Sequence, residues 1–251
     1  MRLIIGILLP ALMIIAWHLA VVSGVLPSSL IASPAAVIVA LVSLTQSGEV
    51  FLHIWASGYR LLAGFLLGSI CGVLAGLLVG VSRYSDRVLS PTLSILAPIP
   101  PVAWIPLLIV FFGIGDGSKV ALIAIGAFFV TQTSAVAGIR GADSALIELA
   151  RANGKSSFSL ARHILVPAAM YEVFTSARIA LALSWILLIA AEVIASSNGL
   201  GWLIWDSRNF ARPDEMIAAM VVVGVLGKVT DSFLLFLQRR VLKWKTEFSG
   251  T

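Results

Sequence analysis

The chain of 251 residues is 59% hydrophobic and only 12% charged, with a mean hydropathy of +1.04. A soluble domain is about 45–50% apolar and about 25% charged, so this composition excludes an ordinary soluble protein. The net charge of +5 accompanies a large apolar excess, which argues against a nucleic-acid-binding protein. With the single cysteine Cys71, the sequence predicts neither a disulfide framework nor a thiolate metal cluster.

Six apolar stretches approach the roughly 20 residues that a helix needs to cross a bilayer. The first exceeds the apolar core of a typical cleaved signal peptide, about 7–15 residues, and is predicted to be an uncleaved span. Between the first two spans, two prolines and a shorter apolar segment favour an interfacial helix. The sequence therefore predicts an all-α integral membrane protein with six transmembrane helices. They are placed at about residues 3–22, 57–81, 88–113, 118–139, 168–195 and 216–237.

The basic residues are distributed unevenly between the two sides of these spans. With a cytoplasmic N-terminus, eleven Lys and Arg residues fall on the cytoplasmic side and three, Lys119, Arg208 and Arg212, on the outer side. Cytoplasmic loops of membrane proteins carry an excess of Lys and Arg, which favours this orientation. Both termini are then predicted to be cytoplasmic, as is the polar segment between the fourth and fifth spans.

The second span carries glycine at every fourth residue. Steps of four follow one ridge of a helix, and glycine allows another backbone to approach closely. The pattern predicts a helix-packing face within the chain, with a subunit contact as the alternative. The glycines are Gly64, Gly68, Gly72, Gly76 and Gly80.

Four prolines interrupt the third span: Pro98, Pro100, Pro101 and Pro106. Each proline removes a helix hydrogen bond and clashes with the preceding turn, at about 3 kcal/mol or more. Irregular backbone at membrane depth is tolerated only against protein or a water-filled cavity. These prolines, with Trp104, are therefore predicted to line a translocation path or its gate. The alternative is a proline-rich helix start close to the membrane surface.

In the fifth span, Arg178, Trp185 and Glu192 are seven residues apart and share one face over about 21 Å. Charged residues inside a span usually face a bundle interior, a partner or a pathway, so these three are candidate path or gate residues. In the alternative, Arg178 reaches the inner surface and Glu192 is hydrated near the outer surface. Lys228 and Asp231, three residues apart in the last span, are predicted to neutralise each other near the inner boundary.

The segment that follows the fifth span is long and rich in glycine and aromatic residues. Trp202, Trp205 and Phe210 in this predicted loop form either part of an interfacial aromatic belt or an outer gate.

The polar cytoplasmic segment is predicted to form two short helices. Residues 143–153 favour a helix that Gly154 ends. Serine and aspartate are good N-caps, so each helix has a candidate cap at its start. These candidates are Asp143 or Ser144 for the first helix and Ser156 or Ser157 for the second.

No segment carries recognisable catalytic or metal-binding chemistry. Gly154-Lys155-Ser156 looks like the end of a phosphate-binding loop, but Leu149 stands where that loop needs glycine. The three histidines are scattered, so no metal cluster and no nucleophile with its base is predicted. The chain is predicted to be no enzyme and to bind no cofactor itself, and the helix pair is predicted to be a docking surface.

This segment resembles the EAA loop of the membrane subunits of binding-protein-dependent ABC importers. The resemblance is carried by Glu148, Ala150 and Gly154, followed by Ile164 and Pro167. In that family the loop fits a cleft on the cytoplasmic ATPase and transmits its closure to the spans. The resemblance implies an ATPase-coupling loop that comprises Glu148, Ala150, Arg151, Asn153, Gly154, Lys155, Ile164 and Pro167.

The resemblance covers almost the whole chain and is weakest over the first 50 residues. Residues 98–119, 176–204 and 239–244 resemble the branch that imports nitrate, aliphatic sulfonates and taurine. The loop departs conservatively from the motif at positions 149 and 166, which leaves the docking prediction intact. Many relatives have arginine where this chain has Ala97. Other members of the branch import pyrimidine vitamin precursors or aromatic acids, and these solutes are the alternative.

The resemblance implies a type I importer permease with one transmembrane domain over residues 1–251. Residues 1–56 would hold the first span and the interfacial helix, 57–237 the permease core and 238–251 a basic cytoplasmic tail. The implied partners are a cytoplasmic ABC ATPase dimer that binds ATP and Mg²⁺, a periplasmic or lipid-anchored solute-binding protein, and a second permease copy in a homodimer. The expected location is the bacterial inner membrane. An ATPase-independent channel or secondary transporter is the more distant alternative.

Overall fold

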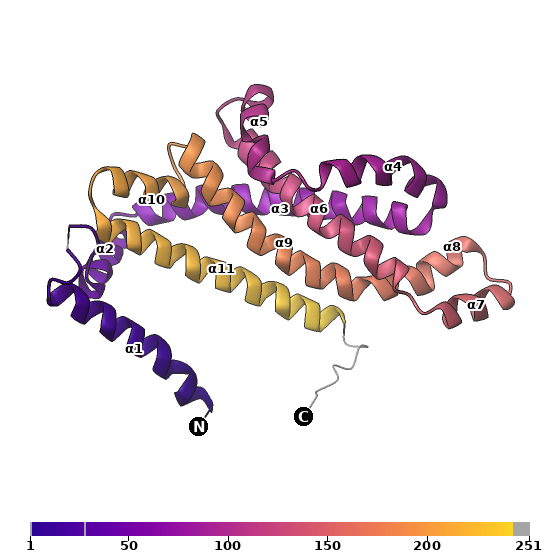
Figure 1. The fold of residues 1–251 in the computed structure, drawn as a ribbon, viewed down its shortest axis with the longest axis horizontal. Helices are drawn as coiled ribbons and strands as arrows, with labels where there is room; N and C mark the ends of the chain where they lie inside the picture. The colour runs from indigo at the N-terminus through magenta and orange to yellow at the C-terminus, as the bar shows by residue number, and fades with distance from the viewer. Residues whose placement is uncertain (1, 28, 243–251) are drawn as a thin grey trace. The chain divides into compact units, whose positions relative to one another are not determined.

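The computed structural model describes residues 2–27 and 29–242, and these residues are helical with no strand among them. The predicted all-α fold is therefore confirmed. Figure 1 shows the helices in chain order. They are α1 (Arg2–Val22), α2 (Pro34–Gln46), α3 (Glu49–Val81), α4 (Arg83–Leu96), the 3₁₀-helix η1 (Pro101–Trp104), α5 (Ile105–Phe112), α6 (Asp116–Arg140), α7 (Ser144–Ala152), α8 (Ser157–Leu160), the π-helix η2 (Ala161–Leu165), α9 (Val166–Ala195), α10 (Leu200–Asn209) and α11 (Pro213–Val241).

The chain divides into two compact units. Unit 1 comprises Met1–Gly58 and Glu192–Leu226, and unit 2 comprises Tyr59–Ala191 and Gly227–Thr251. The predicted basic tail falls largely on residues 243–251, which lie outside the described part of the chain.

The core of unit 1 is small and aliphatic. Val37, Ala40 and Leu44, one turn apart on α2, pack with Leu203 of α10 and with the start of α11. Proline and serine fix the start of α2, because Pro34 occupies the first turn and the Oγ of Ser33 accepts the N–H of Ala36 at 3.3 Å. The predicted interfacial helix is thus a 13-residue helix with one buried face.

In unit 2, α3 and α6 pack closely along the glycine ridge. A Cβ atom added at Gly64 would lie 2.6 Å from the Cβ of Ile123, and one added at Gly76 would lie 2.6 Å from the Cβ of Ala135. Side chains at these positions would push the two backbones apart. The other glycines of the ridge meet α6 in the same way: Gly68, Gly72 and Gly80.

The order of these contacts shows that α3 and α6 run parallel. Gly64 lies against Val120 and Ile123 near the start of α6, whereas Gly80 lies against Ile139 near its end. Two parallel neighbours require a connection that returns along their length. Residues 82–115, which connect α3 to α6, must therefore run from the C-terminal end of α3 back to its N-terminal end.

Ion pairs mark both ends of this return. At one end, the Nη2 of Arg140 lies 3.0 Å from the Oδ1 of Asp86 at the start of α4. At the other end, the Nε of Arg60 lies 2.7 Å from the Oδ1 of Asp116 at the start of α6. The third predicted span thus does bring the chain back along α3.

The returning segment is not the single continuous helix that a span over 88–113 would have. α4 and the segment Pro101–Phe112 are bent by 89° relative to each other, and residues 97–100 lie outside both helices. Pro98, Pro100 and Pro101 lie at this break, where they remove donors and disfavour helical geometry in the preceding residues. The prolines predicted an interruption, and the structure shows it as a sharp bend.

By length and hydropathy, four segments among the described residues can cross a membrane. They are α3, α6, Ala161–Ala195 and α11, and the bent pair makes a fifth if it is one broken span. The described part of α1 contributes a shorter apolar helix at Leu8–Val22. The structure therefore supports four to five of the six predicted spans, and the first stays a prediction.

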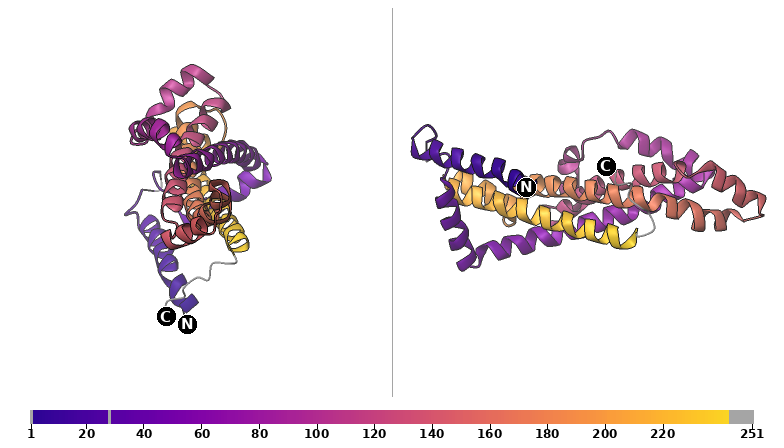
Figure 2. Two further views of the ribbon diagram at one scale, coloured as in Figure 1. Left: turned by 90° about the vertical axis from the view of Figure 1, so that its right-hand side faces the viewer. Right: turned by 90° about the horizontal axis from the view of Figure 1, so that it is seen from below.

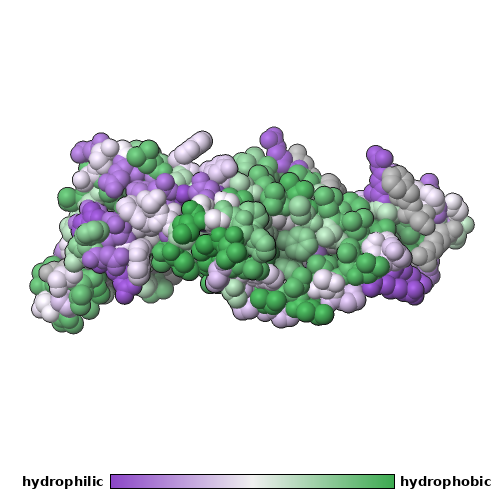
Figure 3. Space-filling view, turned by 90° about the horizontal axis from the view of Figure 1, so that it is seen from above, coloured by the Kyte–Doolittle hydropathy of each residue, from purple (hydrophilic) through white to green (hydrophobic). Residues whose placement is uncertain are grey.

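Many large hydrophobic side chains are exposed. Figure 3 shows a face on which hydrophobic side chains cover broad areas. Large exposed side chains include Leu62, Leu66 and Ile70 on α3 and Val225 and Phe233 on α11. Such a surface needs lipid or another protein chain around it, because water would leave it unstable.

Candidate functional site

The polar segment between α6 and α9 forms a helical hairpin at one end of unit 2, made of α7, α8 and η2 (Figures 1 and 2). The Oδ1 of Asp143 accepts the N–H of Ala145 at 2.9 Å and so caps α7. The Oγ of Ser156 accepts the N–H of Ser159 at 3.3 Å and caps α8. Each cap satisfies a backbone donor that the first helical turn leaves unpaired, and both were predicted.

The turn of the hairpin is a glycine-terminated helix end. Gly154 has φ +70°, and the N–H of Lys155 donates to the carbonyl of Ala150 at 3.0 Å. This bond across five residues, with a left-handed glycine inside it, is a Schellman motif. A Cβ at Gly154 would meet nothing within 4 Å, so the backbone conformation alone favours glycine here.

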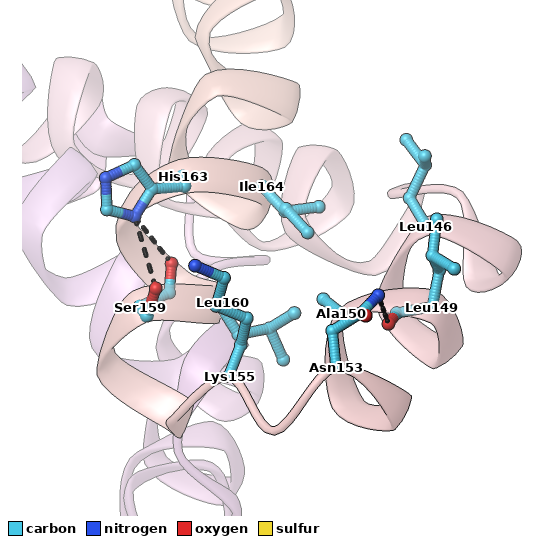
Figure 4. A pocket seen from close by; sticks show the side chains of 9 residues that line it. All are labelled: Leu146, Leu149, Ala150, Asn153, Lys155, Ser159, Leu160, His163 and Ile164. Atoms are coloured by element: carbon cyan, nitrogen blue, oxygen red, sulfur yellow. Dashed lines mark hydrogen bonds between the residues drawn. The ribbon is translucent and has the colours of Figure 1, made fainter.

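Between the two arms of the hairpin lies an open groove of about 560 Å³ (Figure 4). Its apolar part is unusually exposed, because the side chains of Leu146 and Leu149 point away from any core and are 51% and 61% exposed. His163 closes the opposite arm, where its Nδ1 donates to the carbonyl of Ser159 at 3.0 Å. The groove is lined by Leu146, Leu149, Ala150, Asn153, Lys155, Ser159, Leu160, His163 and Ile164.

The structure gathers the predicted coupling residues on this hairpin. Ala150, Asn153, Lys155 and Ile164 line the groove, and Gly154 forms its turn. Of the others, Glu148 is exposed on α7, Pro167 lies in the first turn of α9, and the side chain of Arg151 lies outside the described residues. Their coupling role itself stays a prediction. The local wide turn of η2, which leads directly into α9, is a helix irregularity that is frequent at functional sites.

The proline-rich segment borders an apolar hollow rather than a polar one. A hollow of about 310 Å³ lies against Leu67 and Cys71 of α3, Phe128 of α6 and Trp104 of η1. The indole Nε1 of Trp104 is buried and has no hydrogen-bond partner. The residues that line the hollow include Trp104 and none of the four prolines. Pro98 and Pro100 lie in the break, Pro101 opens η1 and Pro106 lies in the first turn of α5. Their role in a path stays a prediction.

Arg178 and Trp185 both bond to α11. Arg178 forms a two-point ion pair with Asp231, with Nε–Oδ1 at 2.8 Å and Nη2–Oδ2 at 3.1 Å. The indole N–H of Trp185 donates to the Oγ1 of Thr230 at 3.1 Å. Lys228, the predicted partner of Asp231, lies 3.8 Å from its Oδ2, so the predicted pair forms, but Arg178 shares the carboxylate. The fork of an arginine matches a carboxylate in two places, which a lysine cannot do.

Glu192 lies in a buried polar cluster of unit 1 that holds the start of α10. Its carboxylate, 0% exposed, accepts the hydroxyl of Ser57 at 2.8 Å and the N–H of Gly201 at 2.8 Å. Ser57 in turn accepts the N–H of Leu200 at 2.8 Å, and the Nδ1 of His53 accepts the N–H of Gly199 at 3.0 Å. An anion suits the positive end of a helix dipole, so these side chains cap α10.

This geometry corrects two expectations. Glu192 is not hydrated near the outer surface, because it is fully enclosed. The segment after the fifth span is not an extended loop, because it contains α10. In this helix Trp202 stacks on His53, with ring centroids 5.4 Å apart, and Trp205 lies beneath an arginine, as does Phe210 just after the helix.

Several of these partners escaped the sequence analysis. Arg60 could have been found, because it stands four residues before Gly64 and extends the glycine ridge by one step. His53 and Ser57 are likewise four residues apart in an otherwise apolar helix, which indicates a shared polar face. The pairing of Arg178 with Asp231 joins residues 53 positions apart, and no local pattern encodes it.

The site offers exposed surfaces on which a partner could bind. Among the described residues, no group of three or more His, Cys, Asp or Glu side chains could hold a metal ion. What the arrangement provides is a set of membrane-length helices, a paired charge cluster between two of them, and an exposed helical hairpin joined directly to α9.

These are the features of a transport permease, and comparison with known proteins identifies the family. Residues 64–243 match the family described as "Binding-protein-dependent transport system inner membrane component", and the chain belongs to that family. A solved chain of the methionine ABC transporter MetNI, in an inward-facing conformation, has the same fold. Its TM-score is 0.65 at 20% identity, over 79% of this chain and 96% of that one.

Named relatives narrow the resemblance further. The chain is 36% identical to the putative aliphatic sulfonates transport permease protein SsuC of Bacillus subtilis, over 98% of this chain and 89% of that protein. It is 31% identical to the taurine transport system permease protein TauC of Escherichia coli, over 78% of this chain and 71% of that protein. The family resemblance stated from the sequence is thereby confirmed.

Proposed function

We propose that this chain is the membrane-spanning permease of an ATP-driven importer for a small anion, most simply an aliphatic sulfonate or taurine. The family membership and the transport names of the relatives support the class. The same names favour a sulfonate over the pyrimidine precursors and aromatic acids that the sequence left open. A nitrate importer has the same anionic solute class.

The observation that carries the proposal is the exposed groove of the hairpin. Leu149 and its neighbours expose apolar surface outside the membrane-length helices, where an isolated chain would bury it. Basic residues outnumber acidic ones on this side of the spans, which predicts that this side is cytoplasmic. A soluble cytoplasmic protein can therefore reach the groove. An ATPase dimer that binds ATP and Mg²⁺ is the partner that an ATP-driven importer requires.

The connection from groove to membrane explains how such a partner acts. The hairpin passes through η2 into α9 without an intervening loop, so a push on the groove moves the span directly. α9 carries Arg178 and Trp185, which bond to α11. Closure of two ATPase subunits on ATP would therefore change the contact between α9 and α11, and hydrolysis would reset it.

Two further components complete the mechanism. Oligomers of membrane subunits are usually symmetric, and four to five spans are few to enclose a path, so a second copy of this chain completes it. A periplasmic or lipid-anchored binding protein delivers the solute to the outer side. In this arrangement both termini are cytoplasmic and the complex resides in the bacterial inner membrane.

The proposal is tested by purification of the chain from membranes in mild detergent, with mass spectrometry of the subunits that accompany it. We expect an ATPase subunit at a stoichiometry of one per permease, and ATP-dependent uptake of taurine or an alkanesulfonate when the binding protein is supplied to proteoliposomes. Uptake that persists without ATP or without the ATPase would show that the chain is a channel or a secondary transporter.

A further inference from the structure

A lysine lies at the middle of the last apolar helix. Lys228 has 15 residues of α11 before it and 13 after it, so it lies about 20 Å from either helix end at 1.5 Å per residue. With the hydrocarbon core, about 30 Å thick, centred on this helix, the ammonium lies about 15 Å from either surface, farther than its stem can reach. Its side chain is nevertheless 77% exposed.

The charges around Lys228 do not cancel. Asp231 is held at two points by Arg178, at 2.8 and 3.1 Å, and this pair is neutral. Lys228 lies 3.8 Å from the Oδ2 of the same carboxylate, beyond a normal hydrogen bond. Two cations therefore share one anion, and the cluster carries one surplus positive charge.

The neighbouring contacts fix this cluster in place. Trp185 donates to Thr230 at 3.1 Å, one residue before Asp231, and Thr230 donates to the carbonyl of Gly227 at 3.0 Å. The carboxylate and the guanidinium are themselves about one-third exposed, at 31% and 35%. The cluster is thus a preformed and partly open polar face between α9 and α11.

A surplus charge at this depth is too costly to face lipid tails, and intramembrane ionisable groups usually face a water-filled cavity or a pathway. None of the most apolar 18-residue stretch of α11 is buried within the chain, so the chain itself leaves this face uncovered. A monovalent anion beside Lys228 would bring the cluster to neutrality.

We propose that the ammonium of Lys228 binds the transported anion inside the path. It makes a single contact with the anion, beside the Arg178–Asp231 pair. The inference rests on the proposed function and deepens it, because it assigns the solute as a monovalent oxyanion of the sulfonate class. A lysine is a compact, mobile point charge, whereas the arginine fork is already occupied by Asp231. One contact attracts the anion without trapping it, as conduction requires.

Substitution at Lys228 separates charge from shape. Lys228→Met keeps the length of the side chain and removes its charge, Lys228→Arg keeps the charge, and Val225→Met is the control at an exposed site one turn earlier on α11. Each permease is reconstituted with its ATPase and binding protein, and uptake of methanesulfonate, a monovalent anion, is measured beside binding-protein-stimulated ATP hydrolysis. We expect Lys228→Met to lower uptake by roughly tenfold or more, since a charge-assisted contact is lost, with hydrolysis retained. Lys228→Arg and Val225→Met should transport nearly normally.

The outcomes distinguish the inference from the function on which it rests. Wild-type uptake by Lys228→Met overturns the role of Lys228 and leaves the importer intact. Loss of both uptake and hydrolysis in Lys228→Met, with Val225→Met intact, makes the lysine a structural residue and also overturns it. Uptake by the wild-type permease that proceeds without ATP would instead remove the proposed function.

A second measurement tests where Lys228 faces. Lys228→Cys is placed in a Cys71→Ala background, which removes the only native thiol, and is treated with a membrane-impermeant maleimide in the presence and absence of ATP. We expect labelling in at least one nucleotide state. Absence of labelling in both states would place the residue against lipid, a lipid headgroup or the partner copy, and would refute the assignment.

Discussion

The turn at Gly154 gives the sharpest test of the coupling hairpin, because its requirement for glycine comes from the backbone alone. Its φ is +70°, and a Cβ would meet nothing within 4 Å. An L-residue in the left-handed region costs about 1–2 kcal/mol, with asparagine among the residues that tolerate it best. Proline cannot adopt this φ, since its ring holds φ near −65°.

These costs convert into populations of the Schellman turn. A penalty of about 1–2 kcal/mol lowers the fraction of hairpins with the turn closed, relative to open forms, by about 5–30-fold. We therefore expect a graded series in which Gly154→Asn is close to wild type, Gly154→Ala is impaired and Gly154→Pro is the most impaired. The groove loses its shape because Lys155 and Asn153 lie on either side of the turn.

The assay is the ratio of solute transported to ATP hydrolysed in proteoliposomes that contain the ATPase and the binding protein. Membrane insertion and expression should be equal across the series, because the turn lies outside the membrane-length helices. The ratio should fall in the order Asn, Ala, Pro. Equal transport per ATP by Gly154→Pro and wild type would refute the reasoning, as would a Gly154→Asn variant as defective as Gly154→Ala.

Three other substitutions test the packing and the polar clusters. Gly68→Val should lower the free energy of unfolding by about 1–3 kcal/mol, because the new side chain is overpacked against α6, and the Tm in detergent should fall. In the control Gly58→Val a Cβ meets nothing within 4 Å, so the Tm should not change. Glu192→Ala leaves the buried N–H of Gly201 without its acceptor at a cost of about 1–3 kcal/mol, so amide exchange in Leu200–Asn209 should accelerate; unchanged exchange would contradict the cap. Arg140→Gln removes a half-exposed ion pair and should change stability by less than about 1 kcal/mol; a larger fall in denaturation experiments would show that the return segment depends on it.

Local patterns predicted much of this fold because they act over one or two helical turns. The caps at Asp143 and Ser156, the glycine end of α7 and the ridge of glycines on α3 are all determined by residues three or four positions apart. The broken third span was predicted for the same reason, since proline acts on its own turn. The angle of that break was not predictable, because a proline's effect on its own turn does not determine the direction that the chain takes after it.

The partners of the charged residues show where such reasoning ends. The spacing of Lys228 and Asp231 indicated a pair on one helix turn, yet the carboxylate bonds to Arg178 on another helix. Likewise, Glu192 was predicted to share a face with Arg178 and Trp185 or to be hydrated, but it bonds to Ser57, 135 positions earlier in the chain. A carboxylate pairs with the group that gives it the most hydrogen bonds for the smallest desolvation cost. Only the tertiary structure determines which groups are within reach.

The glycine ridge between α3 and α6 has a mechanical consequence. Five successive close approaches leave no slack between the two backbones, so sliding or rotating one helix against the other would drive atoms into each other at every turn. The two helices are therefore expected to move together as one rigid body. Any opening and closing of a passage then has to come from movement of other helices relative to α3 and α6, rather than from movement between these two.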